Sequence, residues 1–239
     1  YFPARFTRDG KIGIMGRLSF QYFNERRIVN INARKDVKLD NRSRVLGILR
    51  GHGAADITRL AEVSGLSKLT VSKIVTHWKK KGAVIPIGKG NAAGEAAGKK
   101  PTLYSINSEY KLIFVSQLYE TALLPAVTNL NAGVIMSERT GFEKNTPLDV
   151  ILGYSRDAFD RMSAALKLND GRFASVVLGT SGITDSKDGV ILFSPHFPSW
   201  GYQIPVVNML QERFPRGYAF HIDNWVRYQA YAESKIGAA

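Results

Sequence analysis

The stretch DITRLAEVSGLSKLTVSKIVTHWKKKGAVIPIG, residues 56–88, decides the fold of the first half of the chain. Asp56 is a typical helix N-cap residue, and it precedes the apolar-periodic run 57–63. Gly65 stands where the chain must reverse between two helices, a position that often needs a positive φ. Ser67 is placed to cap the next helix. The segment therefore predicts two helices joined by a tight turn.

The helix after Ser67 is expected to have two chemically different faces. Its apolar residues recur at i, i+3, i+4 and i+7, the spacing of a buried stripe: Val71, Ile74, Val75 and Trp78. The residues of the opposite face are polar or basic: Lys68, Ser72, Lys73 and Thr76. This pattern is typical of a helix that packs on one side and meets a polar, acidic partner on the other.

The flanking segments complete a small domain. NRSRVLGILR (41–50) has helical spacing and ends at GHG (51–53). GAVIPIG (82–88) and KKPTLYSI (99–106) are strand-like, and the stretch between them is rich in glycine and alanine. We interpret residues 39–108 as an α+β winged helix-turn-helix domain. A structural three-helix bundle would explain the apolar stripe, but not a basic outer face combined with a basic, glycine-rich hairpin.

Charge is distributed unevenly along the chain. Of 33 Lys+Arg and 20 Asp+Glu, residues 1–110 hold 21 and 8, a net +13, whereas residues 111–239 hold 12 of each, a net zero. A basic module fused to a neutral one indicates a nucleic-acid-binding domain, because basic residues neutralise phosphates and release counterions. The alternatives are a generally basic protein or a patch for membrane surfaces. Residues 1–38 are either a basic arm that contacts DNA or an upstream extension.

Composition excludes several classes of protein. The 239 residues leave room for two domains of ordinary size. No cysteine is present, which excludes disulfides and thiolate metal sites and fits a cytoplasmic protein. No apolar run approaches the roughly 20 residues of a membrane span, and residues 1–16 do not resemble a signal peptide. The histidines are scattered, so we predict no catalytic residue, no metal ligand and no cofactor in this chain: His52, His77, His196 and His221.

The predicted partner of the first domain is a double-stranded DNA operator. A helix fits the major groove, where Lys can donate to guanine and hydroxyls can bond base edges or phosphates. The candidate contacts on the third helix are Ser67, Lys68, Thr70, Ser72, Lys73 and Thr76. On the hairpin, the candidates for either the adjacent minor groove or nonspecific phosphates are Gly98, Lys99 and Lys100. Residues 79–81 are expected to contact phosphates or the helix dipole.

The run GLSKLTVSKIVTHWKKKGAVIPIGKG (65–90), followed by GKKPTLYSI (98–106), resembles the winged head of the ROK family. That family groups sugar-responsive repressors with bacterial sugar kinases. The resemblance continues in three further segments: YKLIFVSQLYETALLPAVTNLNAGVI (110–135), FASVVLGTSGITDSKDGVILFSPHFPSW (173–200) and FHIDNWVRYQAYAESKIGAA (220–239). It implies that residues 109–239 form the first lobe of an actin-like ATPase (ribonuclease H-like) domain that senses a sugar.

Pattern alone also predicts an α/β lobe in the second half. KLIFVSQLYE (111–120), ALLPAVTNL (122–130) and FASVVLGTSGI (173–183) are strand-like, and PLDVILGYSRDAFDRMSAALKL (147–168) has helical spacing. Gly179 and Gly182 flank the end of the last of these strands. They mark either a ligand site, because α/β sheets bind ligands at the carboxyl ends of strands, or plain turns.

The segment SQLYET (116–121) matches the loop that holds ATP in the family's kinases. Those kinases carry Asp-x-Gly-Gly-Thr, whose backbone approaches the phosphates closely. This chain has no glycine there, and we expect Ser116 at the aspartate position and obstruction by Leu118 and Tyr119. The resemblance therefore favours a repressor over a kinase.

The resemblance also implies part of a sugar site. Gly182 matches a turn glycine, His196 falls where many members carry a sugar-contacting asparagine, and Asp223 matches the aspartate that is the kinase general base and accepts a sugar hydroxyl. Asp223 is alternatively only an N-cap of the following helix, and His196 only a loop residue. The sequence stops at Ala239, before the segments that would supply the second lobe, the zinc of full-length relatives and the usual homodimer surface.

The sequence thus predicts a sequence-specific transcriptional regulator, in the repressor class, that responds to a sugar or sugar phosphate and is not an enzyme. Full-length relatives are expected to be homodimers. One alternative is a sugar kinase relative. The other is a truncated regulator that binds DNA and senses nothing.

Overall fold

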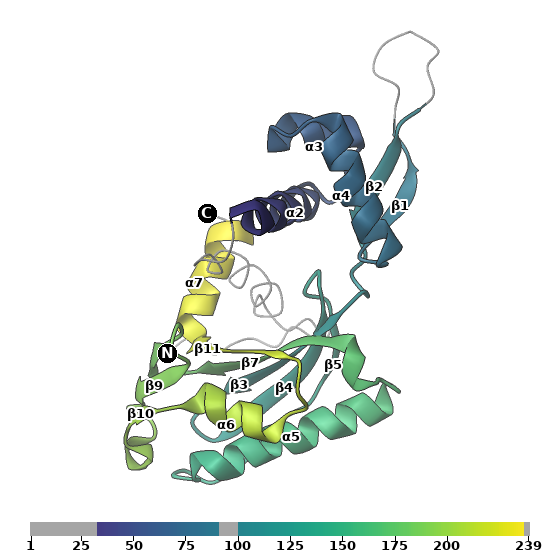
Figure 1. The fold of residues 1–239 in the computed structure, drawn as a ribbon. Helices are drawn as coiled ribbons and strands as arrows, with labels where there is room; N and C mark the ends of the chain where they lie inside the picture. Colours follow the sequence, from purple (N-terminus) through teal and green to yellow (C-terminus); the bar gives the residue numbers. More distant parts are fainter. Residues whose placement is uncertain (1–32, 91–99, 237–239) are drawn as a thin grey trace. The chain divides into compact units, whose positions relative to one another are not determined.

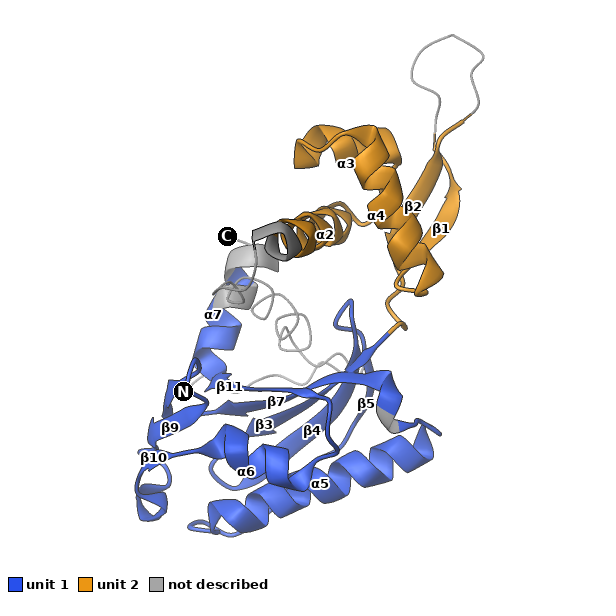
Figure 2. Cartoon of the chain, viewed as in Figure 1, with its two compact units in different colours: residues 1–23, 111–239 blue, residues 24–110 orange. Residues whose placement is uncertain are grey.

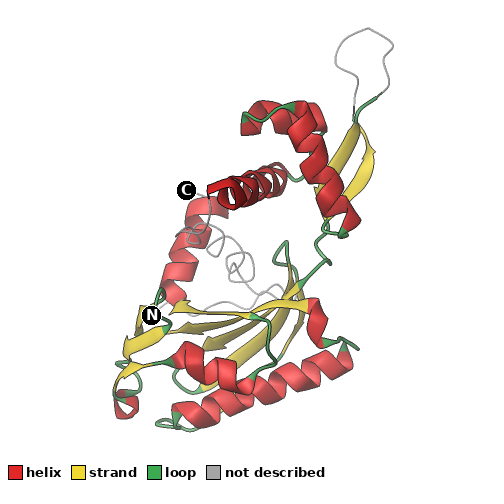
Figure 3. Cartoon of the chain, viewed as in Figure 1, coloured by secondary structure: helices red, strands yellow, loops and turns green. Residues whose placement is uncertain are grey.

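The computed structural model describes residues 33–90 and 100–236, and they fall into two compact units that divide after residue 110 (Figures 1 and 2). In the first unit, helices precede strands (Figure 3). Its elements are α2 (Ala33–His52), α3 (Ile57–Ser64), α4 (Lys68–Lys80), β1 (Val84–Lys89) and β2 (Thr102–Ile106). The three helices and two strands that the sequence predicts here are therefore confirmed.

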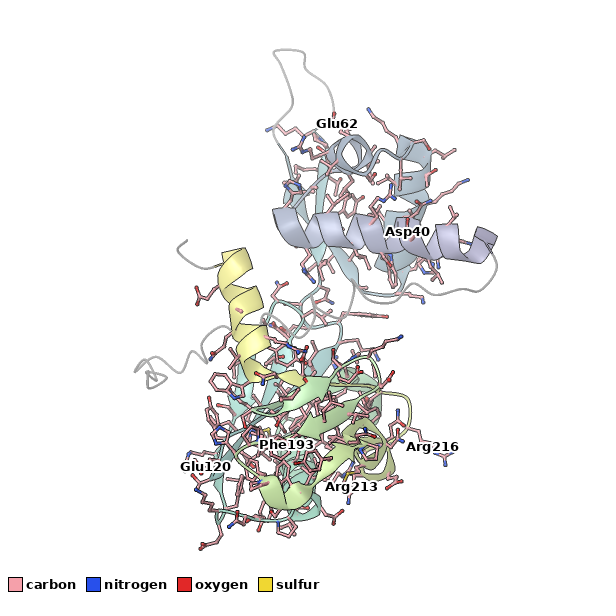
Figure 4. All side chains as sticks on the ribbon, turned by 90° about the vertical axis from the view of Figure 1, so that its left-hand side faces the viewer. Asp40, Glu62, Glu120, Phe193, Arg213 and Arg216 are labelled. Atoms are coloured by element: carbon pink, nitrogen blue, oxygen red, sulfur yellow. The ribbon has the colours of Figure 1, made fainter. Side chains whose placement is uncertain are left out.

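Helix α2 begins earlier than its pattern indicates. It starts at Ala33, so the boundary that we predict between residues 38 and 39 falls inside a helix. The early turns carry no apolar stripe, because Val37 and Leu39 are exposed, and hydrophobic periodicity gives no signal there. One support for this part of the helix is the i, i+4 ion pair between Asp40, marked in Figure 4, and Arg44, at 3.2 Å.

The turn between α3 and α4 has the predicted geometry. Asp56 Oδ1 accepts the amide of Arg59 at 2.8 Å and caps α3. Gly65 ends α3 with φ 69° and ψ 13°, the left-handed conformation that glycine adopts without a Cβ clash. Ser67 Oγ accepts the amide of Thr70 at 3.2 Å and caps α4. Both caps and the glycine turn are thus confirmed.

The hairpin is tied to the helices by backbone hydrogen bonds. Strands β1 and β2 pair antiparallel from Val84 opposite Ile106 to Lys89 opposite Thr102. Ala55, between α2 and α3, exchanges two backbone hydrogen bonds with Tyr104 of β2, at 3.0 and 2.9 Å. The core beneath them is apolar and is drawn from all three helices and the hairpin: Val45, Leu49, Ala55, Leu60, Ala61, Val71, Ile74, Val75 and Val84.

The second unit is built on a mixed sheet in the order β11-β7-β3-β4-β5, with β6 beside β4. The strands are β3 (Leu112–Leu118), β4 (Ala122–Asn129), β5 (Val134–Ser137), β6 (Thr140–Gly141), β7 (Phe173–Thr180) and β11 (Ala219–Asn224). Strands β3, β7 and β11 run parallel, whereas β4 is antiparallel to β3 and to β5. A smaller antiparallel sheet, β10-β9-β8, comprises β8 (Ile183–Asp185), β9 (Val190–Phe193) and β10 (Tyr202–Ile204).

Helices α5 (Leu148–Ala165) and α6 (Val206–Arg213) cover one face of the large sheet, and α7 (Trp225–Ile236) leaves directly from the end of β11 (Figure 1). Short 3-10 turns occupy Asp170–Arg172 and Pro198–Trp200. The α/β character that the sequence predicts for the second half is confirmed, and the structure adds that its large sheet is mixed. In the described ranges, no helix is both long and apolar enough to cross a membrane.

The core between α5 and the sheet is centred on Phe159. Its ring lies 5.2 Å from that of Phe114, 4.7 Å from Phe173 and 5.3 Å from Phe214, measured between ring centroids. Such aromatic pairs contribute beyond the area that they bury. Phe159 is therefore the side chain through which α5, two strands and the segment after α6 contact one another.

Replacing Phe159 by Ala should lower the free energy of unfolding of this unit by about 3–5 kcal/mol, because a buried ring is lost and its neighbours cannot fill the space. Val150→Ala, on the exposed side of the same helix, is the matched control and should change stability little. Urea denaturation followed by tryptophan fluorescence measures both, with Trp78 of the first unit replaced by Phe in all samples so that only Trp200 and Trp225 report. Similar losses in the two variants would contradict this account of the core.

Candidate nucleic-acid interface and ligand site

Helix α4 buries one face and exposes the other, as the sequence predicts. Val71, Ile74 and Val75 are buried in the core of the first unit, and Trp78 packs against it partly buried. The opposite side is solvent-exposed at Lys68, Ser72, Lys73 and Thr76. These four predicted contacts and the N-cap Ser67 are exposed, whereas the sixth, Thr70, is half-buried.

The other two predicted contacts, Ser67 and Thr70, are engaged with each other. Besides the cap, the hydroxyls of Ser67 and Thr70 lie 2.9 Å apart in a mutual hydrogen bond. Their hydrogen-bonding capacity is partly used within the turn, which makes them residues that position the start of α4. The sequence identifies Ser67 as a cap, but spacing alone does not show that Thr70 joins it.

Leu69 is the residue of this face that sequence reasoning missed. Its side chain is 67% exposed, and it precedes Ser72, Lys73 and Thr76 at i, i+3, i+4 and i+7 on one stripe. Apolar periodicity assigns leucines to a core, so it gives no reason to look for one on the polar face. The stripe therefore has an apolar N-terminal end and a polar remainder.

The C-terminal end of α4 is also basic. Lys79 and Lys80 are exposed, and the Lys81 ammonium lies 5.5 Å from the centroid of the Trp78 ring. Desolvation, and after it the charges of Arg42, Lys81 and Lys38, lower the pKa of His77. His77 is accordingly neutral at pH 7, and the positive charge of this end comes from the lysines.

The hairpin carries one described candidate. Lys100 is exposed just before β2, whereas Gly98 and Lys99 lie outside the described residues. Across the hairpin, Lys89 Nζ donates to Thr102 Oγ1 at 2.9 Å. A contact of the hairpin with DNA stays a prediction.

In the second unit, polar side chains gather where the parallel strands end. Gln117 of β3 is in register with Gly179 of β7, which is in register with Asp223 of β11. Their neighbours Ser116 and Ile222 face the helices, since Ser116 bonds Ser155 of α5 at 2.8 Å and Ile222 belongs to the core. Because side chains alternate along a strand, Gln117 and Asp223 point to the opposite face, with only a glycine between them in the row.

Asp223 is fully buried and has three donors on one oxygen. Its Oδ1 accepts from Thr184 Oγ1 at 2.9 Å, from the amide of Asn224 at 2.7 Å and from the Arg227 guanidinium at 3.1 Å. Its Oδ2 is buried without a hydrogen-bond partner among the described residues, as is Gln117 Nε2. The site therefore presents one acceptor and one donor whose hydrogen-bonding capacity is not used.

Capping is not the role that distinguishes Asp223. The amide of Val226, in the first turn of α7, is accepted by Asn224 Oδ1 at 2.8 Å. Asp223 reaches only the adjacent amide, and otherwise it contacts Thr184 and Arg227. The interpretation of Asp223 as nothing more than an N-cap is therefore wrong. Sequence reasoning missed Arg227: it lies in the first turn of α7 whereas Asp223 belongs to β11, so the i, i+4 rule for residues of one helix gives no signal for this pair.

Gly182 is held against two other elements. Its carbonyl accepts from Asn224 Nδ2 at 2.8 Å, next to Asp223. A Cβ at this position would lie 3.0 Å from the carbonyl oxygen of Phe193, which Figure 4 labels, and 3.2 Å from Ile191 Cγ2. The structure thus brings Gly182 and Asp223 together, and packing against β9 is the reason that a glycine stands there.

His196 is placed differently from the other two predicted sugar residues. It lies exposed in the turn after β9, where the amide of Phe197 bonds the carbonyl of Ser194 at 3.0 Å. The pKa of Glu120 is lowered chiefly by the hydrogen bond and the charge of Lys144, and to a smaller extent by His196. No contact of His196 with Asp223 or Gly182 is found in the described part of the chain. Its role as a sugar ligand stays a prediction.

The first half of the segment SQLYET belongs to β3, which ends at Leu118, and residues 119–121 form the turn to β4. With Thr121 as the threonine of the motif Asp-x-Gly-Gly-Thr, the aspartate position is Gln117, whereas we predict Ser116 there; the match of either residue to the motif stays a prediction. The two glycine positions are then Tyr119, whose ring packs 6.1 Å from that of Trp225, and Glu120, which pairs with Lys144 at 2.8 Å (Figure 4). In that alignment, an aromatic ring and a carboxylate stand where the kinases carry their two glycines.

Comparison with known proteins finds repressors that are similar to this chain over most of its length. No protein-family model matches the chain. The xylose repressor of Bacillus spizizenii is 26% identical over 206 residues, covering 85% of this chain and 50% of the repressor. The xylose repressor of Caldicellulosiruptor bescii is 22% identical over 201 residues, covering 84% and 49%. The chain thus spans about half the length of the curated relatives that it matches.

Among solved structures, a ROK family transcriptional regulator described as a homolog of E. coli Mlc aligns with 84% of this chain and 49% of its own, at a TM-score of 0.66 and 18% identity. Over the aligned residues, this chain has the fold of that regulator. The alignment covers 84% of this chain, so it includes residues of both units. The resemblance inferred from the sequence is confirmed.

Replacing Gly182 by Ala should destabilise the second unit by about 1–3 kcal/mol, because the added methyl group meets the Phe193 carbonyl and a packed core must shift. Gly153→Ala on α5, where a Cβ meets nothing within 4 Å, is the matched control. It should leave stability unchanged or raise it by up to about 1 kcal/mol, since alanine favours the helix. Urea denaturation of both variants tests the contact, and equal stability of the two would disprove it.

Proposed function

We propose that this chain contains the DNA-binding domain and the first lobe of the effector domain of a sugar-responsive transcriptional repressor. The observation that carries the proposal is helix α4, which is capped and buried on one side and exposes Ser72, Lys73 and Thr76 on the other. It belongs to a half of the chain with a net charge of +13. A recognition helix in the major groove needs this combination of rigid packing and basic, hydrogen-bonding surface.

In this proposal, the first unit is a winged helix-turn-helix. The turn at Gly65 joins two helices, and the hairpin β1–β2 follows the recognition helix as a wing. The backbone bonds between Ala55 and Tyr104 fix the hairpin to the helices, so that helix and wing can present one surface to a duplex. The xylose repressor relatives support the assignment of the partner as operator DNA.

We propose that the effector is a sugar that binds beside Asp223. The Oδ2 atom of Asp223 can accept from a hydroxyl, and Gln117 Nε2 can donate to one. Thr184 and Arg227 hold the carboxylate in place, which orients the free oxygen. Gly182 and His196 are the other candidates for this site. A homodimer that binds paired half-sites is the expected assembly of the full-length protein.

The runner-up function, a sugar kinase, is disfavoured by the chemistry of the β3–β4 turn. Glu120 places a negative charge where kinases of the family bind phosphate, and the Lys144 ion pair lowers its pKa and keeps it ionised. The packed Tyr119 ring prevents the close approach of backbone amides to an anion. A regulator that binds DNA but senses nothing is the other alternative, and sugar titration of the DNA complex distinguishes it.

The DNA interface is tested with three lysine variants on a duplex selected by the wild-type chain from a random pool. Lys73→Ala should weaken binding to that duplex by about 1–3 kcal/mol and relax its sequence preference. Lys79→Ala should weaken binding to all duplexes alike and reduce the salt slope by about 1. Lys187→Ala, in the neutral half, is the control and should have no effect. Filter binding or fluorescence anisotropy at several salt concentrations measures all three.

Equal losses for Lys73→Ala on selected and random duplexes would reduce Lys73 to a phosphate contact. Absence of any selected sequence would refute the repressor assignment.

For the kinase alternative, we expect no heat of Mg-ATP binding in titration calorimetry and no ADP release with a panel of hexoses and pentoses, because the phosphate cradle is replaced by Tyr119 and Glu120. Saturable ATP binding would favour the kinase.

A further inference from the structure

Helix α4 exposes a leucine, Leu69, on the face that we propose contacts DNA through polar side chains. Leu69 is 67% exposed, and it belongs to neither apolar core. A single exposed leucine is common on protein surfaces and carries no meaning by itself. Its position is what matters, because it begins the stripe that Ser72, Lys73 and Thr76 continue.

The cap of α4 makes Leu69 the first free side chain of that stripe. Ser67 and Thr70 bond each other and the backbone, so their side chains are held against the turn. Lys68 and Leu69 are then the exposed residues of the first turn of α4 that take no part in this cap. In helix-turn-helix complexes the N-terminal residues of the recognition helix contact base edges.

The chemistry of the major groove offers one kind of apolar partner. Guanine, cytosine and adenine present donors and acceptors there, and only thymine presents a methyl group, at C5. A leucine that meets a donor or an acceptor would leave that group without a hydrogen bond, at a cost in free energy. We infer that Leu69 reads a thymine methyl group in the operator and excludes the other bases at that position. This inference rests on the proposed DNA-binding function.

The test removes the methyl group without changing the base pairing. In a duplex selected by the wild-type chain, each thymine is replaced in turn by deoxyuridine. At one thymine per half-site, binding of the wild type should weaken about fourfold, the factor that corresponds to burying one methyl-sized group. Leu69→Ala should bind the thymine duplex more weakly and lose the difference between thymine and deoxyuridine at that position. Leu69→Met, which keeps an apolar side chain, should retain the difference.

Leu39→Ala is the matched control, because Leu39 is 58% exposed on α2 of the same unit and the substitution is the same. It should leave every thymine-to-deoxyuridine difference as in the wild type. Circular dichroism verifies that all variants keep their helices.

The outcomes separate the inference from the function on which it rests. If the wild type selects no sequence, the proposed function fails and the inference falls with it. If the wild type selects a sequence and Lys73→Ala relaxes it, yet every deoxyuridine effect persists in Leu69→Ala, the function stands and the inference is overturned.

Discussion

The left-handed backbone at Gly65 is the constraint on which the first unit depends. Because α3 ends there at φ 69°, the chain turns within three residues and α4 can begin at Lys68 under the cap of Ser67. The direction of α4 after this turn buries Val71, Ile74 and Val75. It also exposes the stripe that begins at Leu69 and ends at Thr76. A side chain at position 65 would be strained in that conformation. The orientation of the exposed face of α4 therefore depends on the same turn that buries its apolar face.

The second unit depends on a buried carboxylate and two glycines near the ends of its parallel strands. A buried carboxylate is costly unless it is paired and hydrogen-bonded, and Asp223 has Thr184, the Asn224 amide and Arg227 on one oxygen. Gly179, in the row between Gln117 and Asp223, contributes no side chain. Gly182 lets β9 approach closely. Small residues beside a fixed acid are what a shaped ligand site requires.

The sequence predicted most of the elements and fewer of the contacts. Caps and the glycine turn were predictable because each depends on residues within about three positions, and the strands were predictable because their apolar runs are buried. The start of α2 was not, since Val37 and Leu39 are apolar but exposed. Thr184 beside Asp223 joins segments far apart in the chain, which no local pattern reports. The sequence did not show which of Ser116 and Gln117 faces the helices. The hydrogen bond between Ser116 and Ser155 of α5 shows that Ser116 does.

The unpaired oxygen of Asp223 has a thermodynamic consequence. A buried acceptor that makes no hydrogen bond raises the free energy of the folded lobe. A hydroxyl that donates to Oδ2 of Asp223 lowers it again. Binding to the folded lobe and not to the unfolded chain then shifts the unfolding equilibrium by mass action. A polyol that occupies this position is therefore also a folding ligand: the unfolding temperature of the lobe should rise with its concentration, whether or not any DNA is present.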